Sequence, residues 1–295
     1  MQYKRSTRSS CTTGTGRKEW HPSPDTNAGF LTVIFLLYLL VGIVAGLLAG
    51  LFGVGGGTII VPALLLCFQW QSVPVELQTH LAIGTSLATI VITSVSSTLA
   101  HHRAGAVRWP VALWLTPGIA AGVWGGAFFA AQLPGPQLQR LFGAFAWLIA
   151  AQMWFGWQPK GHSDVPGKGV LTLAGLVIGG VSALFGIGGG SLTVPFLSWC
   201  RVRMQEAVAT AAACGFPIAL VGALGYVYHG WSQHGLPAHA AGYVYLPALL
   251  GIALTSLPCA RYGARLAHRW PATTLKKVFA GFLVFIGAVL LAGFG

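Results

Sequence analysis

The chain has 295 residues, of which 55% are hydrophobic and only 7% are Asp, Glu, Lys or Arg, whereas about 25% of the residues of an ordinary soluble domain are charged. This composition excludes a soluble globular protein and indicates an all-α polytopic membrane protein. The formal charge of +12 lies mostly in tails and in short loops between apolar spans. That distribution favours orientation in the membrane over a polyanion partner, so we expect no binding of nucleic acid.

The chain begins with a polar stretch, and we expect residues 1–28 to form a disordered tail. The apolar stretch behind it exceeds the roughly 7–15 residues of a cleavable signal peptide, so we expect it to remain as the first membrane helix. Ten apolar segments follow in chain order: Phe30–Phe52, Ile59–Trp70, Leu77–Ala100, Val111–Leu133, Leu141–Trp157, Gly169–Phe185, Leu192–Trp199, Ala207–Tyr228, Ala241–Cys259 and Val278–Phe294.

Two of these segments are too short to cross a bilayer. At about 1.5 Å per residue, Ile59–Trp70 covers roughly 18 Å of a hydrocarbon core that is about 30 Å thick. We therefore expect about 8–10 membrane segments, two of which are half-helices broken by glycine.

A glycine cluster precedes each half-helix. The first reads Gly53-Val54-Gly55-Gly56-Gly57-Thr58-Ile59-Ile60-Val61-Pro62, and the second reads Gly186-Ile187-Gly188-Gly189-Gly190-Ser191-Leu192-Thr193-Val194-Pro195. Glycines, hydroxyl residue and proline fall at the same offsets, 190 − 57 = 133 residues apart. Hydrocarbon does not tolerate exposed backbone, so such a break must be buried in protein or line a cavity. Secondary transporters build substrate sites from duplicated breaks of this kind.

The repeat extends beyond the glycines. Glu76 matches Glu206 and Pro117 matches Pro247, both at an offset of 206 − 76 = 130 residues. We therefore expect two homologous halves of five segments each. The expected boundaries are the tail at 1–28, a first repeat at 29–158, a linker at 159–168 and a second repeat at 169–295.

Lys and Arg residues give the two halves opposite orientations. The loop near residue 104 contains Arg103 and Arg108, whereas its counterpart near residue 235 contains neither Lys nor Arg. The loop near residue 72 contains none, whereas its counterpart contains Arg201 and Arg203. Because short cytoplasmic loops carry the excess of Lys and Arg, this opposite bias predicts an inverted repeat.

The glycine clusters predict an anion site. Successive glycines can point their N–H groups into one concavity, and Thr58 and Ser191 suit the N-cap of a helix. Pro62 and Pro195 are expected near the first turn, where a missing N–H costs least. Free N–H groups and the positive end of the helix dipole attract an anion without a buried lysine. Inverted repeats would bring two such helix starts together at mid-depth.

Other interpretations of the clusters stay open. Small residues also allow close helix packing. A dinucleotide fingerprint is disfavoured because a membrane-length apolar run, instead of a short strand, precedes the glycines. An anion channel uses the same helix N-termini. An enzyme is not expected, since the chain has five acidic residues and none lies inside an expected span.

The paired clusters resemble those of the TauE/SafE family of membrane permeases, as do Ala82-Ile83-Gly84-Thr85-Ser86-Leu87 in the following span and Leu141-Phe142-Gly143. The resemblance covers about residues 30 to 295. It implies transport of a small sulfur-containing anion such as sulfite or a sulfonate, across about eight spans. The second half departs from the pattern, since Gly84-Thr85-Ser86 matches Cys214-Gly215-Phe216.

The residues expected to bind the substrate come from both clusters and from the following span: Gly53, Gly55, Gly56, Gly57, Thr58, Pro62, Thr85, Ser86, Gly186, Gly188, Gly189, Gly190, Ser191 and Pro195. His80, at the start of a span, is a candidate for proton exchange because histidine titrates near neutral pH; a solvated interfacial histidine is the alternative. We expect no cofactor and no metal site. The expected partners are a small anion and the bilayer of the bacterial inner membrane, and association into a homo-oligomer stays open.

Overall fold

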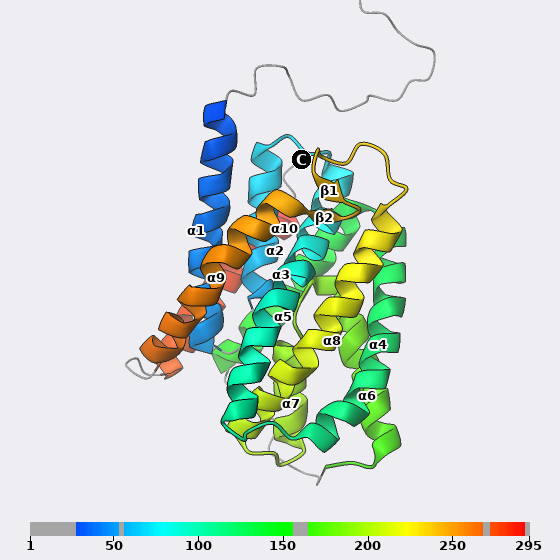
Figure 1. Cartoon of the computed structure of the whole chain (residues 1–295), viewed down its shortest axis with the longest axis vertical. Coiled ribbons are helices and arrows are strands. Elements are labelled where there is room, and N and C mark those ends of the chain that lie inside the picture. The colour runs from blue at the N-terminus through cyan, green and yellow to red at the C-terminus, as the bar shows by residue number, and fades with distance from the viewer. Residues whose placement is uncertain (1–27, 53–55, 156–164, 268–271, 293–295) are drawn as a thin grey trace, which may run out of the picture.

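The computed structural model of the protein describes residues 28–52, 56–155, 165–267 and 272–292. These residues form ten helices and one small hairpin (Figure 1). The helices are α1 (Ala28–Phe52), α2 (Gly57–Trp70), α3 (Val75–Arg103), α4 (Trp109–Gln132), α5 (Gly135–Phe155), α6 (Lys168–Phe185), α7 (Gly190–Trp199), α8 (Met204–Gly230), α9 (Leu246–Ala267) and α10 (Ala272–Ala292). The antiparallel strands β1 (Ala240–Ala241) and β2 (Val244–Tyr245) lie between α8 and α9. The expected all-α fold class is confirmed, and the expected tail lies outside the described residues.

Each expected segment corresponds to one helix, but the starts of α5, α9 and α10 and the end of α9 are corrected. The segment expected to begin at Val278 begins at Ala272, and the segment expected to end at Cys259 continues to Ala267. The segment expected to begin at Ala241 is wrong at its start, because residues 240–245 form the hairpin and α9 begins at Leu246. His239 and Gly242 have positive φ angles of 66° and 56°, which no helix accommodates. The segment expected from Leu141 begins earlier, at Gly135.

Five helices among the described residues are long and apolar enough to cross a membrane: α1, α3, α4, α6 and α8. The two helices that follow the glycine clusters are short, as expected, with 14 residues in α2 and 10 in α7. Figure 1 places α2 in the upper half of the bundle and α7 in the lower half. The two half-helices therefore extend toward opposite ends of the molecule.

Helices α4 and α6 pack backbone to backbone through glycine. Gly118 and Gly122 of α4 face the backbone of Thr172 and Leu176 in α6, with carbonyl oxygens where a Cβ would stand. This close approach is the small-residue packing typical of membrane helices. Residue numbers rise together along both helices, so α4 and α6 run parallel.

The equivalent helices of the opposite halves, α9 and α1, meet in the same way. Gly42 and Gly46 of α1 lie against the backbone of Ile252 and Ser256 in α9, and this pair also runs parallel. Each half thus supplies its first helix to the fourth helix of the other half. The predicted two-fold relation between the halves would produce this exchange.

Helices α3 and α8, the third of each half, pack against each other near the centre. Gly84 of α3 lies against Tyr226, and Ser94, further along α3, lies against Gly215. Residue numbers run in opposite directions, so the pair is antiparallel. An axis in the membrane plane makes such a pair antiparallel, whereas an axis along the membrane normal makes it parallel. This packing agrees with the inverted repeat, which stays a prediction.

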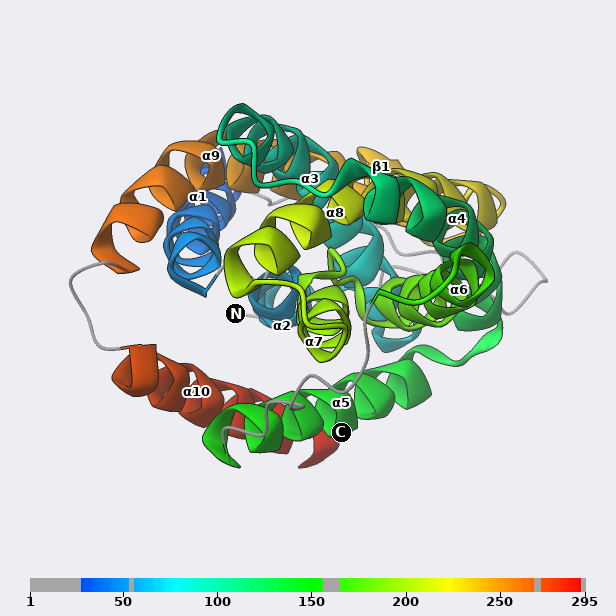
Figure 2. The same ribbon diagram turned by 90° about the horizontal axis from the view of Figure 1, so that it is seen from below.

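The fifth helices, α5 and α10, form a separate outer layer along one side of the bundle (Figure 2). The remaining helices pack around α3 and α8. The C-terminal ends of the two half-helices repeat one geometry. Each helix is followed, two residues after its end, by a non-glycine residue with a φ of 55° (Ser72 and Arg201). In each case the next N–H donates a 3.1 Å hydrogen bond back to the helix, from Val73 to the Phe68 carbonyl and from Val202 to the Leu197 carbonyl.

Candidate functional site

The two glycine clusters meet inside the protein. A Cβ placed on Gly57, the first residue of α2, would overlap the carbonyl oxygen of Gly186, the residue that ends α6. Ile187 is fully buried beside it. Two chain breaks that are more than a hundred residues apart therefore touch, with no side chain between Gly57 and the Gly186 carbonyl. We call Gly56–Thr58 the first glycine loop and Gly186–Ser191 the second.

The second glycine loop needs glycine at two positions. Gly186 and Gly189 have φ angles of 62° and 76°, in the left-handed region that other residues rarely adopt. Ile218 also leaves no room for a Cβ on Gly189. Within the described residues, no hydrogen bond takes up the N–H groups of Gly190 and Ser191, the first two residues of α7. These donors lie at the positive end of the helix dipole.

The structure corrects the expected capping. The N-cap residues are Gly56 and Gly189, and neither helix has a side-chain cap bond. Thr58 and Ser191 lie two residues after these N-caps, as the second residue of α2 and of α7. Pro62 and Pro195 were expected near the first turn at a position where a missing N–H costs least, and that part of the expectation is wrong. Each proline lies inside its helix, where its missing N–H frees the carbonyl four residues earlier, that of Thr58 or Ser191.

The hydroxyl groups of Thr58 and Ser191 are buried and have no hydrogen-bond partner among the described residues. Their exposed fractions are 4% and 9%. The hydroxyls of Ser182 and Thr193 are also unpartnered, and both residues are fully buried. Ser182 is one turn before Gly186, and Thr193 is in the first turn of α7. All four unpartnered hydroxyls therefore belong to the helix ends next to the glycine loops.

Sequence reasoning missed Ser182 and Thr193. The available signal was a hydroxyl in an uncharged span within about one helical turn of a glycine cluster. Such residues usually bond back to their own helix, as Thr89 does to the Thr85 carbonyl at 2.9 Å. The absence of that bond at Ser182 and Thr193 is visible only in the structure.

Thr85 and Ser86 reach the site, but their hydroxyls already have partners. Ser86 donates to the carbonyl of Gly186 at 3.0 Å and so fixes the second glycine loop to α3. The Thr85 hydroxyl accepts the N–H of Tyr245 at 2.9 Å and so ties β2 to α3. These contacts give both residues a positioning role beside the loops. Gly53 and Gly55 lie outside the described residues, and Gly188 packs against Ile90 and Gly215.

His80 is buried, with 3% of its surface exposed, so the structure does not support the solvated interfacial alternative. Its ring nitrogens lie 3.2 Å from the Glu76 carbonyl oxygen and 3.0 Å from that of Ala130. His80 lies in α3, one helical turn before Gly84, and belongs to neither glycine loop.

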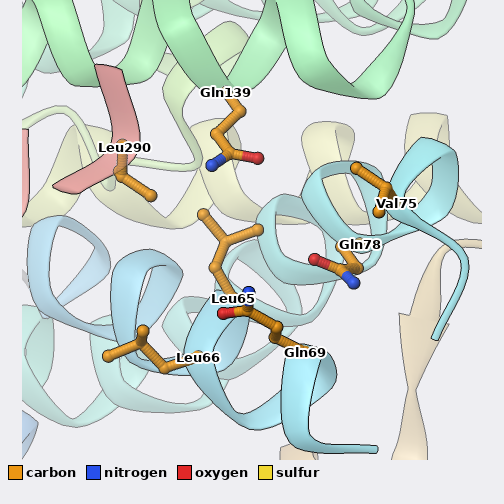
Figure 3. A pocket seen from close by; sticks show the side chains of 7 residues that line it. All are labelled: Leu65, Leu66, Gln69, Val75, Gln78, Gln139 and Leu290. Atoms are coloured by element: carbon orange, nitrogen blue, oxygen red, sulfur yellow. The ribbon is translucent and has the colours of Figure 1, made fainter. Parts of the chain in front are cut away.

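Two hollows lie near the site. A cavity of about 40 Å³ between α2, α3, α5 and α10 is lined by leucine, valine and three glutamines (Figure 3), and it has room for roughly one water molecule. A larger, open cleft of about 460 Å³ lies beside α1 and the hairpin, lined by Thr32, Ile34, Phe35, Tyr38, His239, Tyr245 and Pro247. Neither the cavity nor the cleft is lined by a residue of the glycine loops. Tyr245 connects the cleft to Thr85, whose neighbour Ser86 binds the second glycine loop.

Residues 38–290 match the family described as sulfite exporter TauE/SafE. A probable membrane transporter protein of Haemophilus influenzae is 37% identical over 255 residues, which cover 85% of this chain and 96% of that protein. Probable membrane transporter proteins of Methanocaldococcus jannaschii and Bacillus subtilis are 28% and 27% identical, over 89% and 87% of this chain and 97% of each relative. No solved structure gives a significant match.

The long apolar helices and these relatives identify a multi-pass membrane protein, in agreement with the expected bacterial inner membrane. The chain belongs to the TauE/SafE family of membrane transporters.

Proposed function

We propose that this protein is a secondary carrier for a small anion and that the anion binds between the two glycine loops. The observation that carries the proposal is the group of four buried hydroxyls without partners at the helix ends next to two glycine loops that touch each other, at Gly57 and Gly186. A buried polar group left unpaired costs about 1–3 kcal/mol. A ligand that accepts hydrogen bonds from these groups would recover that free energy.

The chemistry of the site suits an anion. Residues 29–68 and 169–200 contain no charged residue, so the site offers neutral donors only. Hydroxyls, free N–H groups and two helix dipoles stabilise negative charge without the cost of burying a cation. The carbonyls freed by Pro62 and Pro195 add acceptors, which suit an anion that keeps one O–H, such as hydrogen sulfite. The family description directs the proposal to sulfite, a sulfonate or a related sulfur oxyanion.

The position of the loops supports alternating access as the proposed mechanism. They are buried where the two halves meet, while the cleft opens beside the hairpin on one side. A buried site between two repeats fits rocking of one half against the other around a fixed centre. No acidic residue occurs in the segments that form the site, which supports transport without a catalytic step.

Uptake into proteoliposomes tests the proposal. The purified protein is reconstituted and challenged with sulfite, sulfonates, sulfate and carboxylates, with empty liposomes as the control. A carrier gives saturable uptake of a sulfur oxyanion and exchange against the same anion inside. Ohmic single-channel currents would instead identify an anion channel. Uptake of carboxylates alone would identify a permease for another organic anion, and no transport of any anion would refute the proposal.

A further inference from the structure

His80 is held in a protein-lined position at the α3–α4 contact. Its Nδ1 lies 3.2 Å from the carbonyl oxygen of Glu76, and its Nε2 lies 3.0 Å from the carbonyl oxygen of Ala130. The ring stacks on Tyr243, with ring centroids 4.9 Å apart and planes inclined by 27°. The Glu76 carbonyl belongs to α3, the same helix as His80. The Ala130 carbonyl lies in the last turn of α4, and Tyr243 lies in the hairpin.

Both ring nitrogens face carbonyl oxygens, which can only accept hydrogen bonds, and this arrangement favours the imidazolium form with two N–H groups. A carbonyl oxygen can only accept, so each contact requires an N–H on the imidazole. Neutral imidazole has one N–H and one lone pair, whereas imidazolium has two N–H groups. Only the protonated ring satisfies both carbonyls at once. Burial opposes a positive charge here, whereas the C-terminal end of the α4 dipole and the face of Tyr243 favour one.

The surroundings contain few groups that titrate. His80 has no ion pair within the described residues. The titratable groups at this end of the surrounding elements are Tyr243 and Tyr245 of the hairpin, Tyr226 at 6.3 Å from Tyr243, the exposed Glu76 one turn earlier in α3, and His229 of α8, which packs against Phe128 of α4. Charge on His80 is therefore balanced by carbonyl dipoles and a ring face, so the contacts of its two nitrogens depend on its own proton.

The hairpin segment, residues 240–245, lies between the cleft and the second glycine loop. Tyr245 lines the cleft on one side and donates its N–H to Thr85 on the other. Tyr243 stacks on His80 and contacts Tyr226, whose hydroxyl donates to the Ala183 carbonyl at 3.0 Å. Ala183 lies in the last turn of α6, directly before the second glycine loop. Movement of this segment would open a path from the cleft toward the loops.

The matching position in the second half is built differently. Thr210 stands where His80 stands in the first half, at the same 210 − 80 = 130 offset as the glutamates. Its hydroxyl accepts the N–H of Arg108 at 3.0 Å, and the Arg108 side chain pairs with Glu206 at 2.5 Å. The loop between α3 and α4 is thus held to α8 by an ion pair. The hairpin segment is held to α3 and α4 by an imidazole, which titrates near neutral pH.

We propose that His80 is a proton-binding site and that its protonation closes the hairpin segment between the cleft and the second glycine loop. With the proton bound, His80 holds α3, the end of α4 and Tyr243 together. When the proton leaves and the remaining N–H stays on the Glu76 carbonyl within α3, the other nitrogen presents a lone pair to the Ala130 carbonyl, the contact between α3 and α4 is lost, and the segment is released. The gating part rests on the proposed function, since it needs a site for the segment to cover; the proton site does not.

Nitrogen-15 NMR of histidine-labelled protein in lipid bilayers tests the proton site without any substrate. His80 is assigned by the signal that disappears in His80→Gln. We expect both ring nitrogens to carry a proton at about pH 5 and one to lose it by about pH 8. A single N–H on His80 throughout that range overturns the proposal. This measurement on the unmodified protein stands even if the variant folds poorly.

Transport measured from the cleft side tests the gate, with the anion that the wild-type protein carries. The series is run in a His239→Gln background, so that the exposed imidazole on the cleft rim does not contribute. Lowering the pH on that side from about 8 to about 5 should slow entry at least tenfold, and less than twofold after His80→Gln. His229→Gln is the matched control, because His229 packs at the same end of α4 against Phe128 and has no partner on Nε2; it should keep the tenfold response.

Three outcomes overturn the gate: a rate that does not fall with pH, a response that survives His80→Gln, or a response lost in His229→Gln. Failure of the proposed function is a different result, namely no saturable transport of any anion at any pH. The NMR measurement then still decides whether His80 binds a proton.

Discussion

Gly57→Ala is a direct test of the contact between the glycine loops. The added Cβ would stand 2.3 Å from the carbonyl oxygen of Gly186 and 3.1 Å from the Cα of Ile187. A relaxed carbon–oxygen contact is about 3.3 Å, so the loops must separate by roughly 1 Å. Overpacking of this kind costs typically 1–3 kcal/mol, and about 1.4 kcal/mol corresponds to a tenfold change in affinity. We expect transport at subsaturating anion to fall about tenfold to a hundredfold.

The assay is initial uptake into proteoliposomes over a range of anion concentrations, with thermal unfolding measured on the same samples. Gly125→Ala is the matched control, since no atom lies within 4 Å of the new Cβ and the position is exposed on α4; it should transport normally. In Gly56→Ala the tightest contact of the new Cβ is the flexible end of Ile60 at 3.2 Å, with ordinary contacts of 3.7 Å to Ala45 and Ala49, so the effect should be smaller than that of Gly57→Ala. Wild-type affinity and rate in a folded Gly57→Ala protein would refute the contact as the binding site.

Three further predictions use other parts of the structure. Thr58→Val and Ser191→Ala remove hydroxyls that have no partner. The free energy of unfolding should therefore stay unchanged or rise by about 1 kcal/mol, while the affinity for the anion falls about tenfold. A loss of stability with unchanged affinity would contradict this. Glu206→Gln removes the pairing with two arginines and should lower the unfolding temperature at low salt, with the difference vanishing near about 1 M salt; a difference independent of salt would argue against an ionic contact. Single cysteines at Ser72 and Arg201, in a background without the five native cysteines, should react with impermeant reagents from opposite sides of the membrane, and labelling from one side would disprove the inverted repeat.

The helices were predictable because their signals are local. Uncharged apolar runs of membrane length determine where the spans lie, since hydrocarbon excludes both charge and unpaired backbone. The glycine clusters determine the two short helices in the same way, because successive glycines end one helix and free the chain to begin another. Ten expected segments therefore correspond to the ten described helices.

The error at residues 241–245 has a local cause that hydropathy does not report. The stretch is apolar, yet His239 and Gly242 take left-handed backbone angles and the chain turns back on itself. Its apolar side chains pack across the hairpin and against α3, as the stacking of Tyr243 on His80 shows. An apolar composition indicates that a segment is buried, but burial alone does not distinguish a short hairpin from the end of a helix.

The roles of the hydroxyl residues depended on partners distant in sequence. Thr85 and Ser86 were expected to meet the substrate; the structure adds that Thr85 accepts the N–H of Tyr245 and that Ser86 donates to Gly186. Ser182 and Thr193 were not among the expected substrate-binding residues, yet their hydroxyls are without partners, as are those of Thr58 and Ser191. A serine or threonine in a span has many possible acceptors, and only packing decides which of them comes within reach.

By itself, the sequence determined that this chain is a membrane protein with a duplicated, glycine-broken architecture, because those properties follow from the composition and order of neighbouring residues. Only the tertiary structure decided that the two breaks touch, which hydroxyls stay unpaired beside them, and that both nitrogens of His80 face carbonyls. Each of these facts depends on at least one contact between residues fifty or more apart along the chain, or on the absence of a nearby partner. Such distances are set by how all the helices pack together.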